Sequence, residues 1–263
     1  GPRRHQAREL APGPLRGESM KFYSVEVEER EELGSYTLLK YRWSDGPVEP
    51  GQFVMARAAG YPATLDPFLA RPFSFYDYDG RMASLLFEVR GRGTMLLDLA
   101  STIEVTAPLG KGFRIDPGLG RAALLGGGIG VAPLKILGRR LEAVGIPHDI
   151  YLGFADARPA AIARDFPGAG VATMDGSTGT HGTVLDATDS LEGYGGVYAC
   201  GPNPMLAAVK RAARENRLCQ LSVEERMGCG NGSCNGCVVP VRGGGYIRSC
   251  IEGPVFRAEV LAW

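Results

Sequence analysis

The sequence predicts a multi-domain β plus α/β protein, with an antiparallel six-stranded barrel, a parallel-sheet domain and a small C-terminal module around a group of cysteines. Three observations lead to this prediction. Short alternating strands fill residues 20–118, strands alternate with helices over 119–216, and four cysteines lie close together within 217–263. A chain of 263 residues is long enough for two compact units and an appended module.

Residues 1–19 precede the first expected strand. They are rich in Arg, Pro and Gly and lack hydrophobic periodicity, so we expect a disordered tail without a secretory signal. Gly1-Pro2 is typical of the remnant that a protease leaves on an expressed protein, and Met20 is a candidate natural start.

Composition excludes several classes of partner. Lys plus Arg and Asp plus Glu each total 29, and this zero net charge disfavours nucleic acid and anionic membranes as partners. No apolar run approaches the roughly 18 residues of a membrane span. Four of the six cysteines are clustered rather than spread as a disulfide framework, which favours a reducing, cytoplasmic compartment.

The barrel is predicted from alternating apolar residues punctuated by Gly, Pro and Asp. One stretch within it, 94–100, has a helical pattern. The expected strands are 21–27, 35–43, 52–57, 73–76, 83–90 and 102–106.

The tetrapeptide Arg71-Pro-Phe-Ser74 has the chemistry to hold a flavin. Arg71 offers a fork of donors suited to a pyrophosphate, and Pro72 stiffens the chain. The Ser74 hydroxyl can donate to or accept from a ring nitrogen that changes protonation. Gly91-x-Gly-Thr94 precedes the expected helix, whose N-terminus can take phosphate oxygens. The alternative is a salt-bridged surface arginine beside a strand.

Residues 119–216 predict a parallel sheet, with strands at 121–125, 148–154, 170–174 and 195–201 and helices ending near 144 and 216. The first strand ends in a glycine turn, Gly126–Val131, and Pro133 suits the following first helical turn. Ligands bind where parallel strands end, so this turn and Cys200-Gly-Pro202 are expected to face one crevice. The alternative for the glycine turn is a plain tight connection.

The two isolated cysteines have different predictions. Cys200 ends a strand, and its thiol is a candidate for contact with a nicotinamide ring; the alternative is a small buried hydrophobe. Cys219 lies in a probable strand and is expected to be such a hydrophobe.

The clustered cysteines, Cys229, Cys234, Cys237 and Cys250, have the C-x4-C-x2-C-x12-C spacing of a plant-type [2Fe–2S] site. The intervening glycines let the loop curl and turn backbone N–H groups toward the sulfurs. Zinc is the second possibility, although it more often uses two C-x2-C pairs, and a disulfide pair is the third.

Taken in order, Arg71-Pro-Phe-Ser74, Gly93-Thr94, Gly126–Leu134, Tyr198–Met205 and the cysteine pattern resemble the ferredoxin–NADP reductase superfamily. More closely, the chain resembles electron-transfer subunits of class 1B dihydroorotate dehydrogenases. The resemblance implies an oxidoreductase of pyrimidine biosynthesis in which NADH reduces FAD, and electrons pass through the [2Fe–2S] cluster. It also implies an FMN-containing catalytic subunit that docks near the cluster, within a heterotetramer.

The resemblance carries functional residues over by position. FAD is expected at Arg71, Pro72, Phe73, Ser74, Gly93 and Thr94, with Leu86, Phe87 and Glu88 along the ring. The nicotinamide dinucleotide is expected at Gly126, Gly127, Gly128, Ile129, Gly130, Val131, Cys200, Gly201 and Pro202. Ser74 and Cys200 are the expected catalytic residues.

Two departures accompany the resemblance. Glu88 stands where relatives often have a basic residue, so we expect either that one positive contact to FAD is missing or that Arg90 or Arg92 supplies it. Asn231 and Asn235 flank the cluster in place of small residues, and their hydrogen bonds are expected to shift its potential.

Cofactor choice and partner leave alternatives. Asp156 favours NAD by repelling a 2′-phosphate, whereas Arg158 would favour NADP. Other electron-transfer complexes, such as a hydrogenase, a sulfur reductase or a bifurcating enzyme, fit the same motifs. A different class is a zinc-binding redox sensor or structural protein with a degenerate flavin fold.

Overall fold

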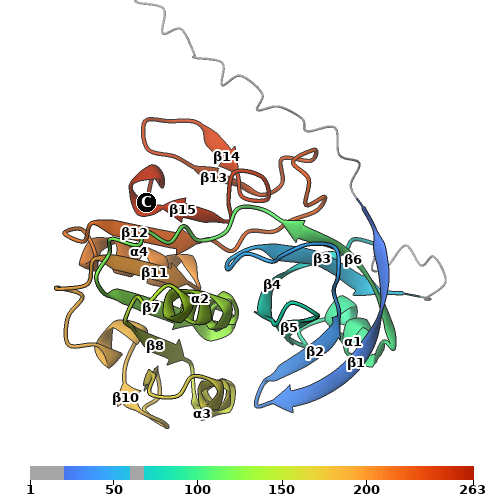
Figure 1. Cartoon of the computed structure of the whole chain (residues 1–263), viewed down its shortest axis with the longest axis horizontal. Helices are drawn as coiled ribbons and strands as arrows, with labels where there is room; N and C mark the ends of the chain where they lie inside the picture. The colour runs from blue at the N-terminus through green and yellow to red at the C-terminus, as the bar shows by residue number, and fades with distance from the viewer. Residues whose placement is uncertain (1–20, 60–67) are drawn as a thin grey trace, which may run out of the picture.

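The computed structural model describes residues 21–59 and 68–263, so the expected tail at 1–19 lies outside the described residues. A barrel and a sheet domain stand side by side, and the C-terminal segment lies along one edge of both (Figure 1). Among the described residues, no helix combines the length and apolarity needed to span a bilayer.

The N-terminal half forms the expected six-stranded antiparallel barrel, which is closed in the order β1-β2-β5-β4-β3-β6. Its inward-facing apolar residues include Leu39, Phe75 and Ile103, all fully buried. Helix α1 (Arg92–Leu99) connects β5 to β6 and begins two residues before the predicted helix. The strands are β1 (Tyr23–Leu33), β2 (Tyr36–Arg42), β3 (Phe53–Ala58), β4 (Arg71–Tyr78), β5 (Met82–Glu88) and β6 (Thr102–Leu109).

The second half is built on a seven-stranded sheet with the order β10-β9-β8-β7-β11-β12-β15. Every pairing is parallel except β12 with β15. All six residues of the central β7 are buried, as expected for a strand covered on both faces. The strands are β7 (Ala122–Gly127), β8 (His148–Phe154), β9 (Gly170–Thr173), β10 (Thr180–His181), β11 (Gly196–Cys200), β12 (Leu218–Ser222) and β15 (Val255–Arg257).

Helices cover this sheet. The longest are α2 (Ala132–Ala143) and α4 (Asn203–Ala212), and α3 (Ala157–Ala160) is a single turn. Helix α4 ends before the predicted limit near residue 216, because the chain turns there to enter β12. Short 3-10 helices occupy η1 (Gly128–Val131), η2 (Ala161–Asp165), η3 (Val184–Ala187) and η4 (Ala258–Val260).

The C-terminal segment divides its contacts between both halves. Strands β12 and β15 join the parallel sheet, whereas β13 (Val238–Pro240) and β14 (Tyr246–Arg248) form a separate hairpin. Cys237 and Cys250 pack against Phe53 and Met55 of β3. A division of the chain between residues 216 and 217 stays a prediction, since β12 begins just after it and pairs directly with β11.

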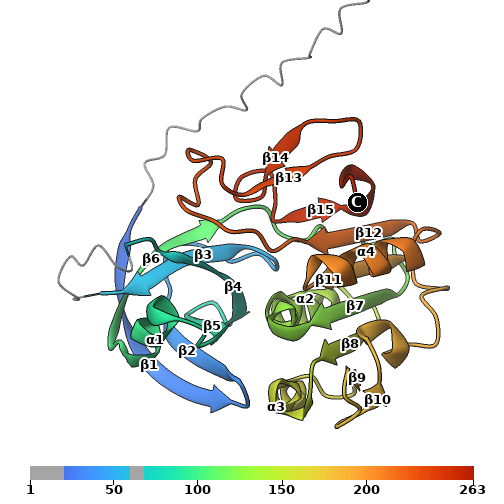
Figure 2. The ribbon, with the colours of Figure 1, turned by 180° about the vertical axis from the view of Figure 1, so that it is seen from behind.

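The barrel and the sheet domain share a core and a polar seam. Helix α2 lies between them (Figure 2), and one apolar cluster contains barrel residue Tyr76 together with Leu134 of α2. The Tyr76 hydroxyl donates to Asp165 at 2.7 Å. Lys135 of α2 lies 3.2 Å from Asp165 and 3.7 Å from Asp77. These contacts fix the barrel strand β4 against the helix that follows the glycine turn.

Candidate functional site

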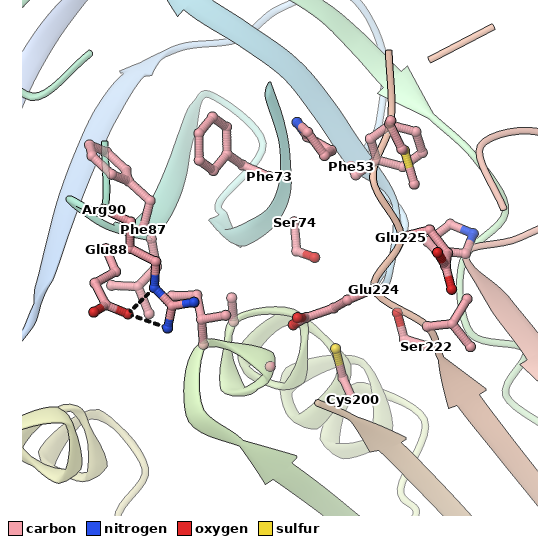
Figure 3. Close-up of a pocket in the computed structure, with 18 residues that line it drawn as sticks. Phe53, Phe73, Ser74, Phe87, Glu88, Arg90, Cys200, Ser222, Glu224 and Glu225 are labelled. Carbon is pink, nitrogen blue, oxygen red and sulfur yellow. Dashed lines mark hydrogen bonds and ion pairs between the residues drawn. The ribbon is translucent and has the colours of Figure 1, made fainter. Parts of the chain in front are cut away.

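A cleft of about 270 Å³ opens where the barrel, the sheet domain and the C-terminal segment meet (Figure 3). Side chains from β4 and β5 form one wall, and the start of α2 and the end of β11 form the other. Of the predicted residues, the cleft is lined by Pro72, Phe73, Ser74, Leu86, Phe87, Glu88, Ile129, Gly130 and Cys200.

The glycine turn and the loop after β11 touch each other. A Cβ added at Gly130 would overlap the carbonyl oxygen of Cys200, and one added at Gly127 would overlap the Met205 side chain. Gly128 has φ +56°, a conformation that side chains disfavour. Strands β7 and β11 are parallel neighbours, with Gly126 opposite Cys200, so their two end loops emerge at one place. Glycine at these positions permits the close approach.

Arg71, Gly93 and Thr94 come together beside the cleft rather than in its lining. The Arg71 guanidinium lies so close to Gly93 that any Cβ there would overlap it. The Thr94 hydroxyl accepts from the N–H of Arg90 at 3.0 Å and of Gly91 at 3.2 Å, which orders the start of α1. A guanidinium at a helix N-terminus is a donor set for phosphate oxygens. Together with the apolar ring-facing wall of the cleft, it fits a flavin dinucleotide.

Ser74, Cys200 and Glu224 point into the same space within the cleft (Figure 3). The Cys200 thiol is almost fully buried, and burial raises its pKa well above the ordinary value of 9.0. The thiol is therefore neutral at pH 7 and is not poised as a nucleophile. Cys200 is a small buried residue that also lines the cleft, and its contact with a nicotinamide ring stays a prediction.

Two carboxylates of the cleft, Glu224 and Glu225, were not predicted. Burial raises the pKa of Glu224, partly offset by the charge of Arg90. Burial also raises the pKa of Glu225, while a hydrogen bond with Asn203 lowers it. Both follow β12, in which Ser222 pairs with Cys200. The sequence does contain a clue to these two carboxylates. If the probable strand around Cys219 joins the parallel sheet, the residues that follow it lie at the ligand-binding edge of that sheet.

The acidic residue at position 88 is neutralised within the chain. The Arg90 guanidinium lies 2.7 Å from the Glu88 carboxylate, and both residues line the cleft. Arg90 therefore lines this wall with its charge paired to Glu88, and its contact with FAD stays a prediction.

The four clustered cysteines stand as two pairs. The Cys234 N–H donates to Cys229 Sγ, and the Cys250 N–H donates to Cys237 Sγ, each at 3.4 Å. The Gly236 N–H, followed by the Cys229 thiol, lowers the pKa of Cys234 to about 7. Burial raises the pKa of Cys250 to about 12. Across residues 21–59 and 68–263, no group of three His, Cys, Asp or Glu side chains could hold one metal ion.

This arrangement fits a [2Fe–2S] cluster, in which two irons share four thiolates. Each pair offers two sulfurs, and backbone N–H groups already point at three of the four: Cys229, Cys234 and Cys237. Gly230 and Gly232 have φ +70° and +81°, and these conformations curl the loop. The residues present therefore suit the cluster.

The lining of the cleft ends close to the first clustered cysteine. Met227 lines the cleft, and Cys229 follows two residues later. Cys229 also borders a separate cavity of about 390 Å³ on the barrel surface, with Met55 and Leu69 among its lining. The cysteine loop thus lies between the cleft and the outer surface.

Comparison with known proteins gives the family. Residues 224–262 match the family model "Iron-sulfur cluster binding domain of dihydroorotate dehydrogenase B". A protein of Caldanaerobacter subterraneus subsp. tengcongensis, named "Dihydroorotate dehydrogenase B (NAD(+)), electron transfer subunit", is 38% identical over 232 residues, which cover 84% of this chain and 90% of the relative. A Geobacillus kaustophilus protein of the same name is 42% identical over 224 residues, which cover 80% of this chain and 85% of the relative. The chain belongs to the family of dihydroorotate dehydrogenase B electron-transfer subunits.

Solved structures share the fold of this chain. An NADH-dependent reduced ferredoxin-NADP oxidoreductase, described for flavin-based electron bifurcation, matches with a TM-score of 0.79 and 26% identity, covering 95% of this chain and 92% of that one. Phthalate dioxygenase reductase shares the fold, with a TM-score of 0.58 and 16% identity. The match covers 84% of this chain and 86% of that one. The predicted resemblance and fold class are confirmed. The roles of individual site residues stay predictions.

Proposed function

We propose that this chain is an electron-transfer subunit that passes electrons between NADH and a dihydroorotate dehydrogenase catalytic subunit, through FAD and a [2Fe–2S] cluster. One observation carries the proposal. A single cleft has the barrel strands β4 and β5 on one wall and the glycine turn and the end of β11 on the other, and its lining reaches Met227, two residues before the first cysteine. A two-electron donor, a flavin and a one-electron cluster need this adjacency.

The chain's own residues bind and orient. Arg71, Gly93 and Thr94 hold the FAD pyrophosphate, and Pro72–Ser74 with Leu86–Glu88 flank the ring. Gly126–Val131 and Cys200–Pro202 hold the nicotinamide dinucleotide. FAD held by these residues would supply the chemistry that links the two-electron oxidation of NADH to one-electron transfer to the cluster.

Ser74 and Cys200 act on the reacting rings. The Ser74 hydroxyl can donate or accept as a ring nitrogen changes protonation. The neutral Cys200 thiol offers a polarisable surface without a charge, so it can lie against a nicotinamide ring in either redox state. Together they orient the two rings.

The nucleotide is NAD rather than NADP. The Asp156 carboxylate follows β8, where it accepts from the Arg158 N–H at 2.9 Å and caps α3. A carboxylate held there repels a 2′-phosphate and can accept from a ribose hydroxyl. Relatives at about 40% identity carry NAD(+) in their names.

The partner is an FMN-containing dihydroorotate dehydrogenase catalytic subunit that docks near the cluster, in a cytoplasmic heterotetramer of pyrimidine biosynthesis. The names of the relatives support the partner. None of the six cysteines forms a disulfide, which is consistent with a reducing compartment.

Reconstitution tests the proposal. The chain is co-purified with the catalytic subunit from the same source, and dihydroorotate-dependent NAD⁺ reduction is measured. We expect turnover only with both subunits, and particle mass from light scattering reports the heterotetramer. A stable complex with all cofactors and no NAD⁺-linked turnover would contradict the function.

A second function has one specific observation in its favour. The bifurcating NADH-dependent reduced ferredoxin-NADP oxidoreductase covers nearly the whole chain with a TM-score of 0.79. In a bifurcating complex the chain would pair with a subunit that exchanges electrons with ferredoxin. Ferredoxin-dependent NAD⁺ reduction, without dihydroorotate, distinguishes this case.

A further inference from the structure

The fourth cysteine comes from a different part of the chain than the other three. Cys229, Cys234 and Cys237 belong to one loop, and Cys250 lies in a turn after the β13–β14 hairpin. Two backbone N–H groups of this turn donate to Cys237 of the loop. The Ser249 N–H donates to the Cys237 carbonyl at 2.9 Å, and the Cys250 N–H donates to its sulfur at 3.4 Å.

One ion pair closes the turn around Cys250. Arg248 Nη2 lies 2.7 Å from Glu252 Oε1, and Nε lies 3.3 Å from Oε2. The Arg248 N–H also donates to the same carboxylate at 2.7 Å, and the Glu252 N–H donates to the Arg248 carbonyl at 2.9 Å. Cys250 is thus enclosed between two residues that hold each other by side chain and backbone.

Arg248 also reaches across to the cysteine loop. Its Nη1 donates to the Gly232 carbonyl at 3.4 Å. A Cβ at Gly232 would lie 3.2 Å from the same nitrogen and 2.8 Å from Ile251, so the guanidinium packs closely against the loop backbone. Gly232 stands between Cys229 and Cys234, which places the contact within the first cysteine pair.

The charge of Arg248 suits this position. Four thiolates around a cluster carry net negative charge, and a fixed guanidinium offsets part of it. A lysine could supply the charge, but it lacks the planar fork that binds Glu252 and Gly232 together.

We propose that Arg248, held by Glu252, is a positioning residue for the iron–sulfur site: it locks the Cys250 turn onto the cysteine loop and thereby slows loss of the cluster. The proposal rests on the proposed function only in that the four cysteines bind a [2Fe–2S] cluster. It concerns the protein's own contacts outside the ligands, which commonly orient the ligands of a metal site.

The test compares cluster release in the wild type, Arg248→Gln, Arg248→Lys and Glu252→Gln. Arg257→Gln is the matched control, because it removes another exposed Arg–Glu pair of the C-terminal segment, that with Glu259. Each protein is exposed to an iron chelator under anaerobic conditions, and bleaching of the cluster absorbance is followed. Bound FAD and the visible circular dichroism of the cluster are measured in the same samples.

We expect Arg248→Gln to release iron roughly tenfold faster, at the lower end of the effect of removing an outer contact of a metal ligand. Glu252→Gln and Arg248→Lys should fall between it and the wild type, and the cluster dichroism should change in Arg248→Gln. FAD content should stay constant. Release from Arg248→Gln at the rate of Arg257→Gln would overturn the proposal, and so would parallel loss of FAD, which indicates general unfolding. If Arg248→Lys released its cluster as slowly as the wild type, the positive charge alone would explain the effect and the positioning role would be overturned.

The wild type separates this proposal from the proposed function. Iron and sulfide absent from the wild type would contradict the proposed function itself. A stable wild-type cluster with an unaffected Arg248→Gln variant would overturn the positioning role alone.

Discussion

The cleft and the cysteine segment use different means to hold their functional atoms. The cleft is built from the ends of regular strands, and the apolar core shared by the barrel and the sheet domain aligns them. Residues 223–237 contain no helix or strand, and a few N–H to sulfur hydrogen bonds define their geometry. We expect the cleft to keep its shape without cofactors and the cysteine segment to depend on its cluster.

The largest expected effect is loss of the cluster from the cysteine segment, with the cleft left intact. Cys229→Ser removes one thiolate from the first pair, so we expect iron to fall from about two per chain to nearly none, because a [2Fe–2S] cluster uses all four ligands. FAD binding and flavin reduction by NADH should persist. Iron, sulfide and flavin assays on one sample check this result.

Cys219→Ser is the control for that substitution, since Cys219 lies in β12 outside the cysteine loop. It should keep the cluster. Loss of FAD together with iron in Cys229→Ser would show that the two regions are not independent.

The converse substitution disturbs the cleft and leaves the cysteine segment intact. Gly130→Val places a side chain against the backbone carbonyl of Cys200, which cannot move without shifting β11. We expect a loss of about 1–3 kcal/mol in the free energy of unfolding, typical of overpacking, and roughly tenfold weaker NADH binding. Denaturant unfolding and an NADH titration measure both, and iron content should be unchanged.

Gly118→Ala is the matched control, because its nearest neighbour is the flexible end of Arg217 at 3.3 Å. Equal NADH affinity in both glycine variants would contradict the close contact between the two loops.

A smaller effect is expected at the seam that supports the cleft. Tyr76→Phe removes the buried hydroxyl that donates to Asp165 at 2.7 Å, at a cost of about 1 kcal/mol. Tyr78→Phe is the control, since its hydroxyl makes only a 3.4 Å exposed contact with the Gly46 carbonyl. The midpoint temperature of thermal unfolding should fall by about 2–4 °C in Tyr76→Phe and stay unchanged in Tyr78→Phe. A larger shift for Tyr78→Phe would place the stabilising contact elsewhere.

The smallest effect is a pH dependence at the same seam. Burial alone raises the pKa of Asp165, but the Tyr76 hydroxyl and Lys135 outweigh it and hold the pKa below its ordinary value of 3.8. The folded state therefore favours the carboxylate, and this stability is present above pH 3.8 and is lost as the pH falls through the folded pKa. The difference in stability between the wild type and Asp165→Asn should shrink in that acid range. Urea unfolding over a pH series measures this difference in the free energy of unfolding. A difference that stayed constant into the acid range would contradict the prediction.

The sequence predicts the regular parts of the molecule well, for a physical reason. Alternating residues in the barrel strands and the glycine turn before α2 are local signals, and both appear in the structure. The pairing of β15 with β12 is not local, because it joins residues more than thirty positions apart through a three-residue strand.

The candidate site divides in the same way. Arg71, Ser74, Gly130 and Cys200 are marked by residue types that bind phosphates or ring systems. Glu224 lies in the cleft only because β12 pairs beside β11. The Glu88–Arg90 ion pair likewise depends on side-chain directions that the residue order does not fix.

The most direct measurement of the central claim is an anaerobic absorbance titration of the purified protein with NADH, after flavin, iron and sulfide assays. We expect about two irons per chain and bleaching of both the flavin and the cluster absorbance bands as NADH is added. A flavin band that bleaches while an intact cluster stays oxidised would contradict the claim that the cleft passes electrons to the cysteine loop.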